Sequence, residues 1–217
     1  MKQDLAESYQ NEIITAVRNE SDIVFVPYSA LEKTEERIKF ALAKILEKHN
    51  RFDLFTPIFS CIKELVSNAT KANAKKILIE EGVIQNPDDP AEIVKKVRSI
   101  LNERSLLEYG IKAKKHKMST RVYLKVYKKH LFIEVINNIP LSRKEMNKIN
   151  DRIKRSSRYD NIAAFFMENQ DPEAEGMGLG ISMVVVLLKN INITHRNFTI
   201  TTDGTGKTYA RMLIPLS

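Results

Sequence analysis

The sequence predicts an α+β sandwich in which helices pack on one face of a mostly antiparallel sheet. Two alternating apolar runs, 121–127 and 131–137, flank Lys128 and Lys129 and predict a β-hairpin. Longer segments with helical periodicity precede this hairpin, and two more strands are expected near the C-terminus. Because strands and helices are segregated along the chain, an antiparallel sheet is favoured over a parallel one.

The first half of the chain reads as mainly helical. Leu5, Tyr9, Ile13 and Val17 recur every four residues and predict an amphipathic helix over 3–18. Apolar spacing and the strand residues before Pro27 predict the elements that follow, namely a strand at 23–26, helices at 30–48 and 52–74, and a strand that begins at 76–80.

A helical insertion is expected between this last strand and the hairpin, at about 82–118. Asp89 supplies an N-cap, Pro90 suits the first helical position and Glu92 adds a carboxylate in the first turn. Gly110 is the expected stop. The insertion either packs on its own domain or docks a partner, and the sequence leaves both readings open.

After the hairpin we expect a helix at 181–189 and strands at 192–201 and 208–215. The chain is therefore divided into an N-terminal helical extension, 1–21, and one main domain, 22–217, that contains the insertion.

Composition narrows the function classes. No apolar run is long enough to cross a bilayer, so we expect no membrane association. The single cysteine, Cys61, fits a helix core, which excludes a disulfide framework and makes a reducing cytoplasm the expected location. The net charge of +8 suits an acidic partner, but the lysines are spread along the chain without interleaved aromatics, so nucleic acid is not favoured.

Three alternating glycines form the most informative motif. Gly176, Gly178 and Gly180 open the apolar run at 181–188. Glycine lets the backbone approach an anion, and the start of a helix offers free N–H groups and a positive dipole end. The pattern fits a polyphosphate loop, although an ordinary turn before a core helix has the same appearance.

A carboxylate and an amide share one face of the helix predicted at 52–74. Glu64 and Asn68 are four residues apart, and Lys71 follows one turn later. Asparagine is unfavourable in the middle of a helix, so Asn68 indicates a functional role. A solvated helix glutamate is the alternative interpretation of Glu64.

Together these motifs resemble the N box, here 64–74, and the glycine-rich G2 box, here 176–185, of the GHKL (Bergerat-type) ATPase superfamily. The Gly-Lys-Thr-Tyr segment and the Ile-Pro end of 206–215 are similar to the family's last strand. The aromatic pair 165–166 lies where histidine kinases often have an aromatic segment. This resemblance covers 22–217 and implies a histidine kinase-like ATPase fold.

The resemblance also implies that the chain binds ATP with Mg²⁺. Asn68 matches the family's metal-binding amide. Glu64 matches a position that is a carboxylate base in several branches, where it activates water or a hydroxyl acceptor. A triphosphate needs its charge neutralised by a divalent ion and by cationic or N–H donors. The implied ATP contacts are Asn68, Lys71, Asn137, Gly176, Gly178, Leu179, Gly180 and Thr208.

The adenine site departs from the family pattern. Members usually carry Asp-x-Gly-x-Gly, whereas this chain has Asn137 in place of the aspartate and Ile139 and Leu141 in place of the glycines. The Asn137 carbonyl can still accept the adenine amino proton, at a loss of about 1 kcal/mol relative to a charged acceptor. We therefore expect weaker ATP binding, not its loss.

The expected function is that of an ATP-binding signalling or regulatory protein, with phosphorylation of a protein partner as the reaction. A serine kinase, a histidine kinase or an ATPase would each fit, and the alternative is an interaction module that has lost turnover. His49 precedes the N box too closely for a phosphoacceptor helix pair and is interpreted as a helix-end residue. Candidate partners are a response regulator, an anti-sigma-type partner, a kinase subunit or a second copy of the chain.

Overall fold

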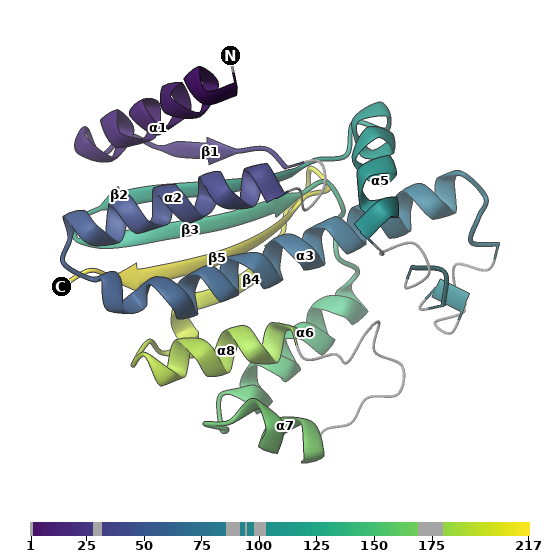
Figure 1. The fold of residues 1–217 in the computed structure, drawn as a ribbon. Coiled ribbons are helices and arrows are strands. Elements are labelled where there is room, and N and C mark those ends of the chain that lie inside the picture. The colour runs from purple at the N-terminus through teal and green to yellow at the C-terminus, as the bar shows by residue number, and fades with distance from the viewer. Residues whose placement is uncertain (1, 28–31, 86–91, 94, 98–102, 169–179) are drawn as a thin grey trace.

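A five-stranded antiparallel sheet forms the centre of the molecule, and the chain has an α+β fold (Figure 1). The computed structural model describes residues 2–27, 32–85, 92–93, 95–97, 103–168 and 180–217. The strands, in spatial order, are β1 (Ile23–Phe25), β2 (Thr120–Tyr127), β3 (His130–Asn137), β5 (Thr208–Pro215) and β4 (Phe198–Thr202). The expected antiparallel sheet is therefore confirmed.

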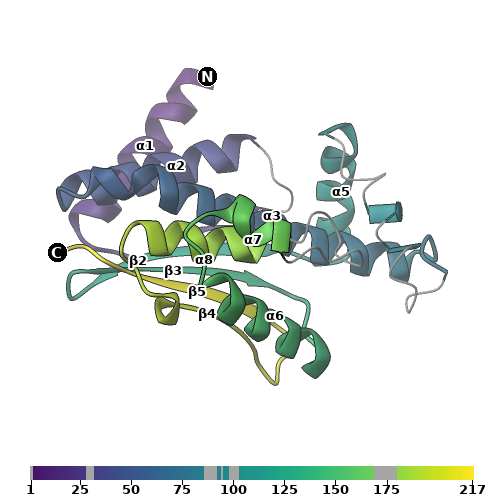
Figure 2. The same cartoon turned by 90° about the horizontal axis from the view of Figure 1, so that it is seen from below.

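The described helices cover mainly one side of this sheet (Figure 2). Of these, α2, α3 and α8 lie over the strands, α1 packs on α2, and α6 packs on α8 and the edge strand β4. Their bounds are α1 (Lys2–Arg18), α2 (Glu32–Lys48), α3 (Phe55–Glu80), α5 (Glu103–Lys115), α6 (Arg143–Ser156), α7 (Ile162–Glu168) and α8 (Gly180–Asn190). None of these helices is both long enough and apolar enough to cross a bilayer.

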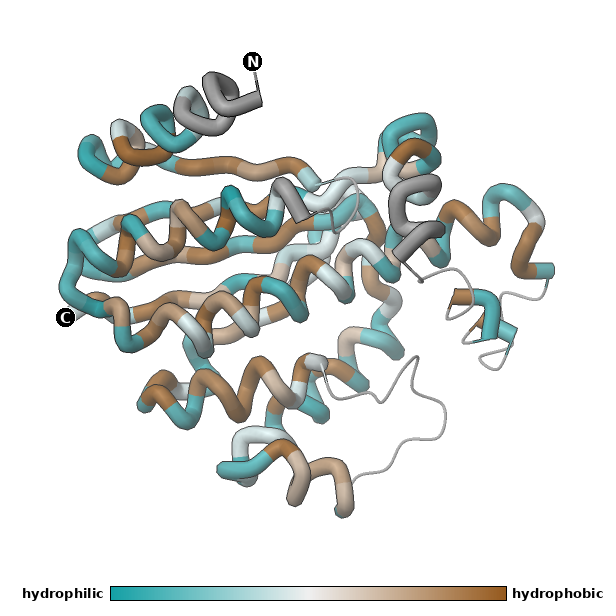
Figure 3. Tube along the Cα trace, in the orientation of Figure 1, coloured by the Kyte–Doolittle hydropathy of each residue, from teal (hydrophilic) through white to brown (hydrophobic). Residues whose placement is uncertain are grey.

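The main core lies between the sheet and these helices. Alternate residues of β3 point inward, and Leu131, Ile133 and Val135 are almost completely buried. Each such side chain contributes roughly 1.5–3 kcal/mol to the burial free energy. In Figure 3 hydrophobic stretches lie on the strands and on α8, and α3 carries them along its length, including its far end.

The β2–β3 hairpin follows the prediction closely. Lys128 and Lys129 connect the strands and both adopt positive φ, 45° and 60°. Two positive φ values are typical of a type I′ turn, whose twist matches that of the flanking strands. The hairpin places Thr120 opposite Asn137, and β5 places Thr208 on the other side of Asn137.

A second, smaller core lies at the far end of α3 and corrects two predictions. The strand expected at 76–80 is wrong, because α3 continues as a helix to Glu80. Gly110 does not end a helix either, since α5 continues through it to Lys115. The buried members of this second core are Ala74, Ile77, Leu78, Ile84, Ile93, Val97, Tyr109 and Ala113.

The described part of the insertion thus packs on the outer half of α3. Residues 92–93 and 95–97 are helical, whereas the expected helix start at Asp89 lies outside the described residues. The strand expected at 192–201 begins only at Phe198, because His195–Asn197 forms a 3₁₀ turn capped by Thr194.

Helix α6 was not predicted. It begins with a capping box, in which the Ser142 hydroxyl accepts from the Glu145 N–H while the Glu145 carboxylate accepts from the Ser142 N–H. The Ser-x-x-Glu spacing of this box is visible in the sequence, but the strongly polar composition of 143–156 obscures the helical periodicity.

Candidate functional site

The structure places the last glycine of the glycine-rich motif beside the Glu64/Asn68 motif, where α8 begins next to α3. Glu64 and Asn68 lie one turn apart on α3, and Gly180 is the first residue of α8. A Cβ atom added to Gly180 would overlap the Glu64 carboxylate and lie 3.1 Å from Asn68 Nδ2. The Glu64 carboxylate therefore occupies the space that a side chain at position 180 would need, and a larger residue there would displace it.

The helix pair is held by contacts deeper in the main core. Cys61 is completely buried, and its Sγ lies 3.9 Å from the carbonyl oxygen of Val184 on α8. Burial, together with the nearby charge of Glu64, raises the pKa of the Cys61 thiol to about 12. Because the reactive form of cysteine is the thiolate, Cys61 serves as a core residue, as expected.

A cavity of about 110 Å³ opens between α3 and the sheet, next to this helix pair. It is much smaller than the roughly 300–1,000 Å³ of a typical small-molecule pocket, so it accommodates one part of such a ligand. Its apolar walls and few polar groups suit a flat, weakly polar ring. The lining residues are Leu65, Asn68, Ala69, Val135, Asn137, Leu141, Ile149, Ile181, Ile200, Thr208 and Ala210.

Asn137 provides a polar group on the cavity wall. It is the last residue of β3, and it is only 6% exposed. Among the side chains that the structure describes, none is hydrogen-bonded to the Asn137 amide. Its atoms are not among the completely buried polar atoms that lack a partner, so the amide can be reached from the cavity and can pair with a ligand.

Thr208 lines the same cavity from β5. Its hydroxyl donates to the carbonyl oxygen of Ile139 at 2.6 Å and so fixes the loop that follows β3. The hydroxyl oxygen keeps a lone pair with which it can accept a hydrogen bond. Asn68, Asn137 and Thr208, three of the predicted contacts, therefore surround one cavity.

The structure does not place the remaining predicted ATP contacts on the cavity wall. Lys71 lies on α3, half buried, and does not line the cavity. Gly176, Gly178 and Leu179 lie outside the described residues.

Most of the apolar residues that line the cavity were not predicted from the sequence. Ile149 was missed because α6 was not predicted, and the capping box at Ser142 was the available signal. Ile200 and Ala210 come from inward positions of β4 and β5, which strand alternation would have identified once the sheet order was known.

The described residues contain no group of three or more His, Cys, Asp or Glu side chains that could hold a metal ion. The oxygen-bearing side chains beside Gly180 are one carboxylate, Glu64, and one amide, Asn68.

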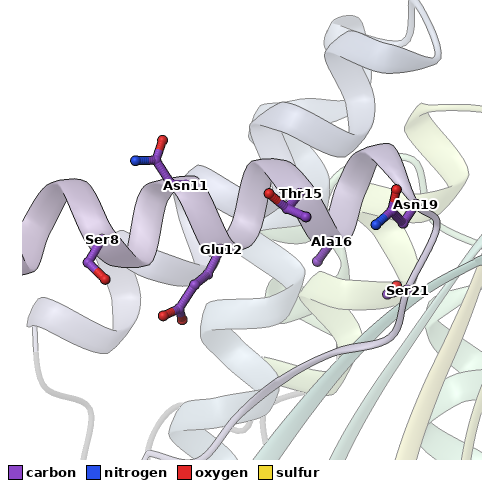
Figure 4. A pocket seen from close by; sticks show the side chains of 7 residues that line it. All are labelled: Ser8, Asn11, Glu12, Thr15, Ala16, Asn19 and Ser21. Carbon is purple, nitrogen blue, oxygen red and sulfur yellow. The ribbon is translucent and has the colours of Figure 1, made fainter.

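A larger and more open depression of about 590 Å³ runs along α1 (Figure 4). Every residue that lines it comes from the single segment 8–21, and Glu12 is its only ionisable side chain. Ligand sites normally combine polar groups from several elements, so this depression is a feature of the helix surface.

Comparison with known proteins identifies one relative of undetermined function. An uncharacterized protein of Treponema pallidum (strain Nichols) is 27% identical over 157 residues, which cover 71% of this chain and 30% of that protein. The matched region thus spans less than a third of its relative. No protein-family model matches the chain, and no solved structure matches it significantly.

Proposed function

We propose that the chain binds Mg²⁺-ATP at the cavity between α3 and the sheet and acts as a regulatory protein that phosphorylates a protein partner. The observation that carries the proposal is the convergence of Asn68, Asn137 and Gly180, which come from three separate elements. Their adjacency was expected from two sequence motifs alone. A response regulator, an anti-sigma-type protein or a kinase subunit would be a suitable partner.

The described residues fit such a ligand. The cavity has room for the nucleobase, and the Asn137 amide oxygen can accept a hydrogen bond from an exocyclic amino group. Asn68 and the N-terminus of α8 lie together, where a cation and the phosphates would be held.

Bound Mg²⁺-ATP would supply an electrophilic γ-phosphoryl group. Glu64 lies beside Asn68 and Gly180, where its carboxylate can accept the proton of an attacking hydroxyl or water. The apolar walls of the cavity would keep water away from the bound nucleobase.

Isothermal titration calorimetry with Mg²⁺-ATP tests the binding site. Asn68→Ala should weaken binding about fivefold or more, because it removes a cation ligand. Asn11→Ala on α1, an exposed asparagine far along the chain, is the matched control and should bind normally. Equal binding by the wild type and Asn68→Ala contradicts the site.

The role of Asn137 is tested through base selectivity. Asn137→Asp introduces a charged acceptor and should tighten ATP relative to GTP by about fivefold. An unchanged ratio would show that Asn137 does not read the base.

The Glu64→Gln variant tests whether the chain is an enzyme or an interaction module. The glutamine keeps the shape of the side chain and removes its basicity, so ATP affinity should persist while phosphate release and transfer fall roughly 10²–10⁴-fold. Radiolabelled ATP provides the measurement. Turnover that is insensitive to Glu64 contradicts the proposed base, and binding without turnover in the wild type supports the module.

A further inference from the structure

The outward side of α6 is the most strongly charged surface among the described helices. Residues 143–156 place five exposed cations within an arc of roughly 140° around the helix axis, and a sixth, Arg158, follows two residues after the helix ends. We call this surface the α6 basic face, and it consists of Arg143, Lys144, Lys148, Lys154, Arg155 and Arg158.

Little negative charge offsets these cations. Asp151 is the only carboxylate within the arc, and it pairs with Arg155 at 2.9 Å. Glu145 lies outside the arc and is engaged in the capping box with Ser142. Within the described part of the chain, no carboxylate pairs with Arg143, Lys144, Lys154 or Arg158.

Helix stability accounts for only part of this charge pattern. Lys154 and Arg155 lie in the last turn, where the helix dipole favours cations. Arg143 is the first residue of α6, where the positive end of the dipole disfavours a cation, and Lys144 and Lys148 repel each other at a spacing of four residues. The cations of the first half of α6 thus do not stabilise the helix, which points to a role in binding.

The opposite side of α6 is already occupied. Ile153 and Ser156 are buried, and the helix packs against α8 and β4. A helix that binds a membrane surface inserts its apolar side into the lipid, and α6 has no such side to offer. A partner must therefore bind through the cations.

The local chemistry favours a protein over a nucleic acid. The basic face contains no aromatic side chain, and the nearest one, Tyr159, packs edge-on against Phe165 and donates its hydroxyl to Glu168. Unpaired bases would therefore find no stacking surface. Asp151 lies near the middle of the arc, where it would repel a continuous phosphate backbone but not a protein segment with spaced carboxylates.

We propose that the α6 basic face is a docking surface for an acidic segment of a protein partner. Ile149, on the inner side of α6, lines the cavity, so the same helix contributes to the candidate site and carries the basic face on its outward side. This inference does not require nucleotide binding, and it is tested without nucleotide.

Fluorescence anisotropy with a labelled peptide of alternating Glu and Ala pairs is a direct test. Lys144→Glu/Lys154→Glu/Arg158→Glu should weaken peptide binding by roughly tenfold or more at low ionic strength, because three attractive contacts become repulsive. Circular dichroism verifies folding. If this variant unfolds, the corresponding triple glutamine variant replaces it and should still lose about threefold.

The matched control reverses three exposed lysines of α5 and the turn after it. Lys114→Glu/Lys115→Glu/Lys117→Glu changes the net charge by the same amount and should retain near wild-type peptide binding. Equal losses in both variants would show that only net charge matters, and the proposal would then be wrong. Tighter binding to a DNA oligonucleotide or to phosphatidylserine vesicles than to the peptide would also overturn it.

Discussion

The two hydrophobic cores share helix α3 but are built differently. The main core lies between the sheet and the first half of α3, so it depends on strand pairings between segments far apart in the sequence. The second core lies on the outer half of α3 and gathers residues of the α3 end, the insertion and α5. One continuous helix thus joins the main core, which has many long-range contacts, to a small core formed only with the insertion and α5.

The comparison predicts different consequences of similar core substitutions. Ile133 is completely buried in the centre of the main core. Ile133→Ala should lower the free energy of unfolding by about 3–5 kcal/mol through lost burial and a residual cavity. Urea denaturation followed by circular dichroism should show one transition at a lower midpoint. A change below about 1 kcal/mol would mean that the sheet is not the main source of stability.

Ile77 is the equivalent residue of the second core and is also completely buried. Ile77→Ala should cost about 2–3 kcal/mol, with the effect concentrated in the outer region. Hydrogen exchange should show faster exchange of α5 amides and little change in β3 and β5. Equal loss of protection in the sheet would indicate that the two cores unfold as one unit.

Substitution of two glycines, one near each core, tests the same difference between the two regions. An added Cβ at Gly180 meets the Glu64 carboxylate, whereas Gly82, with φ of +70°, has no atom within 4 Å of an added Cβ. Gly180→Ala should therefore displace the Glu64 carboxylate at a cost below about 1 kcal/mol, because the end of this side chain can rotate away, and should weaken ATP binding. Gly82→Ala should cost about 1–2 kcal/mol through backbone strain alone and should leave ATP binding unchanged. Denaturation and calorimetry of both variants distinguish the two causes.

The smallest effect concerns the charges that join α3 to α5. Lys112 donates to the Glu81 carboxylate at 2.5 Å and lowers the pKa of that group. Because the unfolded chain binds this proton more readily, the contribution is present above about pH 4.5 and is lost as the pH falls through the lower folded pKa. Lys112→Met should cost about 0.2–1 kcal/mol at neutral pH and less in acid.

Urea denaturation of this variant at neutral and acidic pH gives the measurement. Lys114→Met on the same helix is the control, since Lys114 is exposed and has no acidic partner among the described residues. A pH-independent effect of Lys112→Met would assign its cost to packing of the side chain instead.

Much of the main domain could be predicted because its patterns are local. Alternation defined the β2–β3 hairpin, and helical spacing placed Glu64 and Asn68 on one face. Gly180 lies beside both residues, while the other glycines of its motif lie outside the described residues. The nucleotide itself stays a prediction.

The elements that the sequence predicted wrongly are determined by tertiary packing. The Ile-Leu-Ile segment at 77–79 has high strand propensity, but Ala74, Ile77 and Leu78 bury at helical spacing against the insertion. Gly110 lies inside α5, where neighbouring residues on the same helix pack on α3. Neither contact is visible in the sequence of either segment alone.

The continuity of α3 gives the molecule a mechanical property. Between Ile58 and Glu80 the helix contains neither glycine nor proline, the usual causes of a kink. Asn68 and Glu80 are separated by roughly 18 Å along its axis, so a pivot of about 5° at Asn68 moves the outer end by about 1.6 Å. Any rotation of this uninterrupted helix at the cavity would therefore be carried to Ala74, Ile77 and Leu78, on which the second core packs.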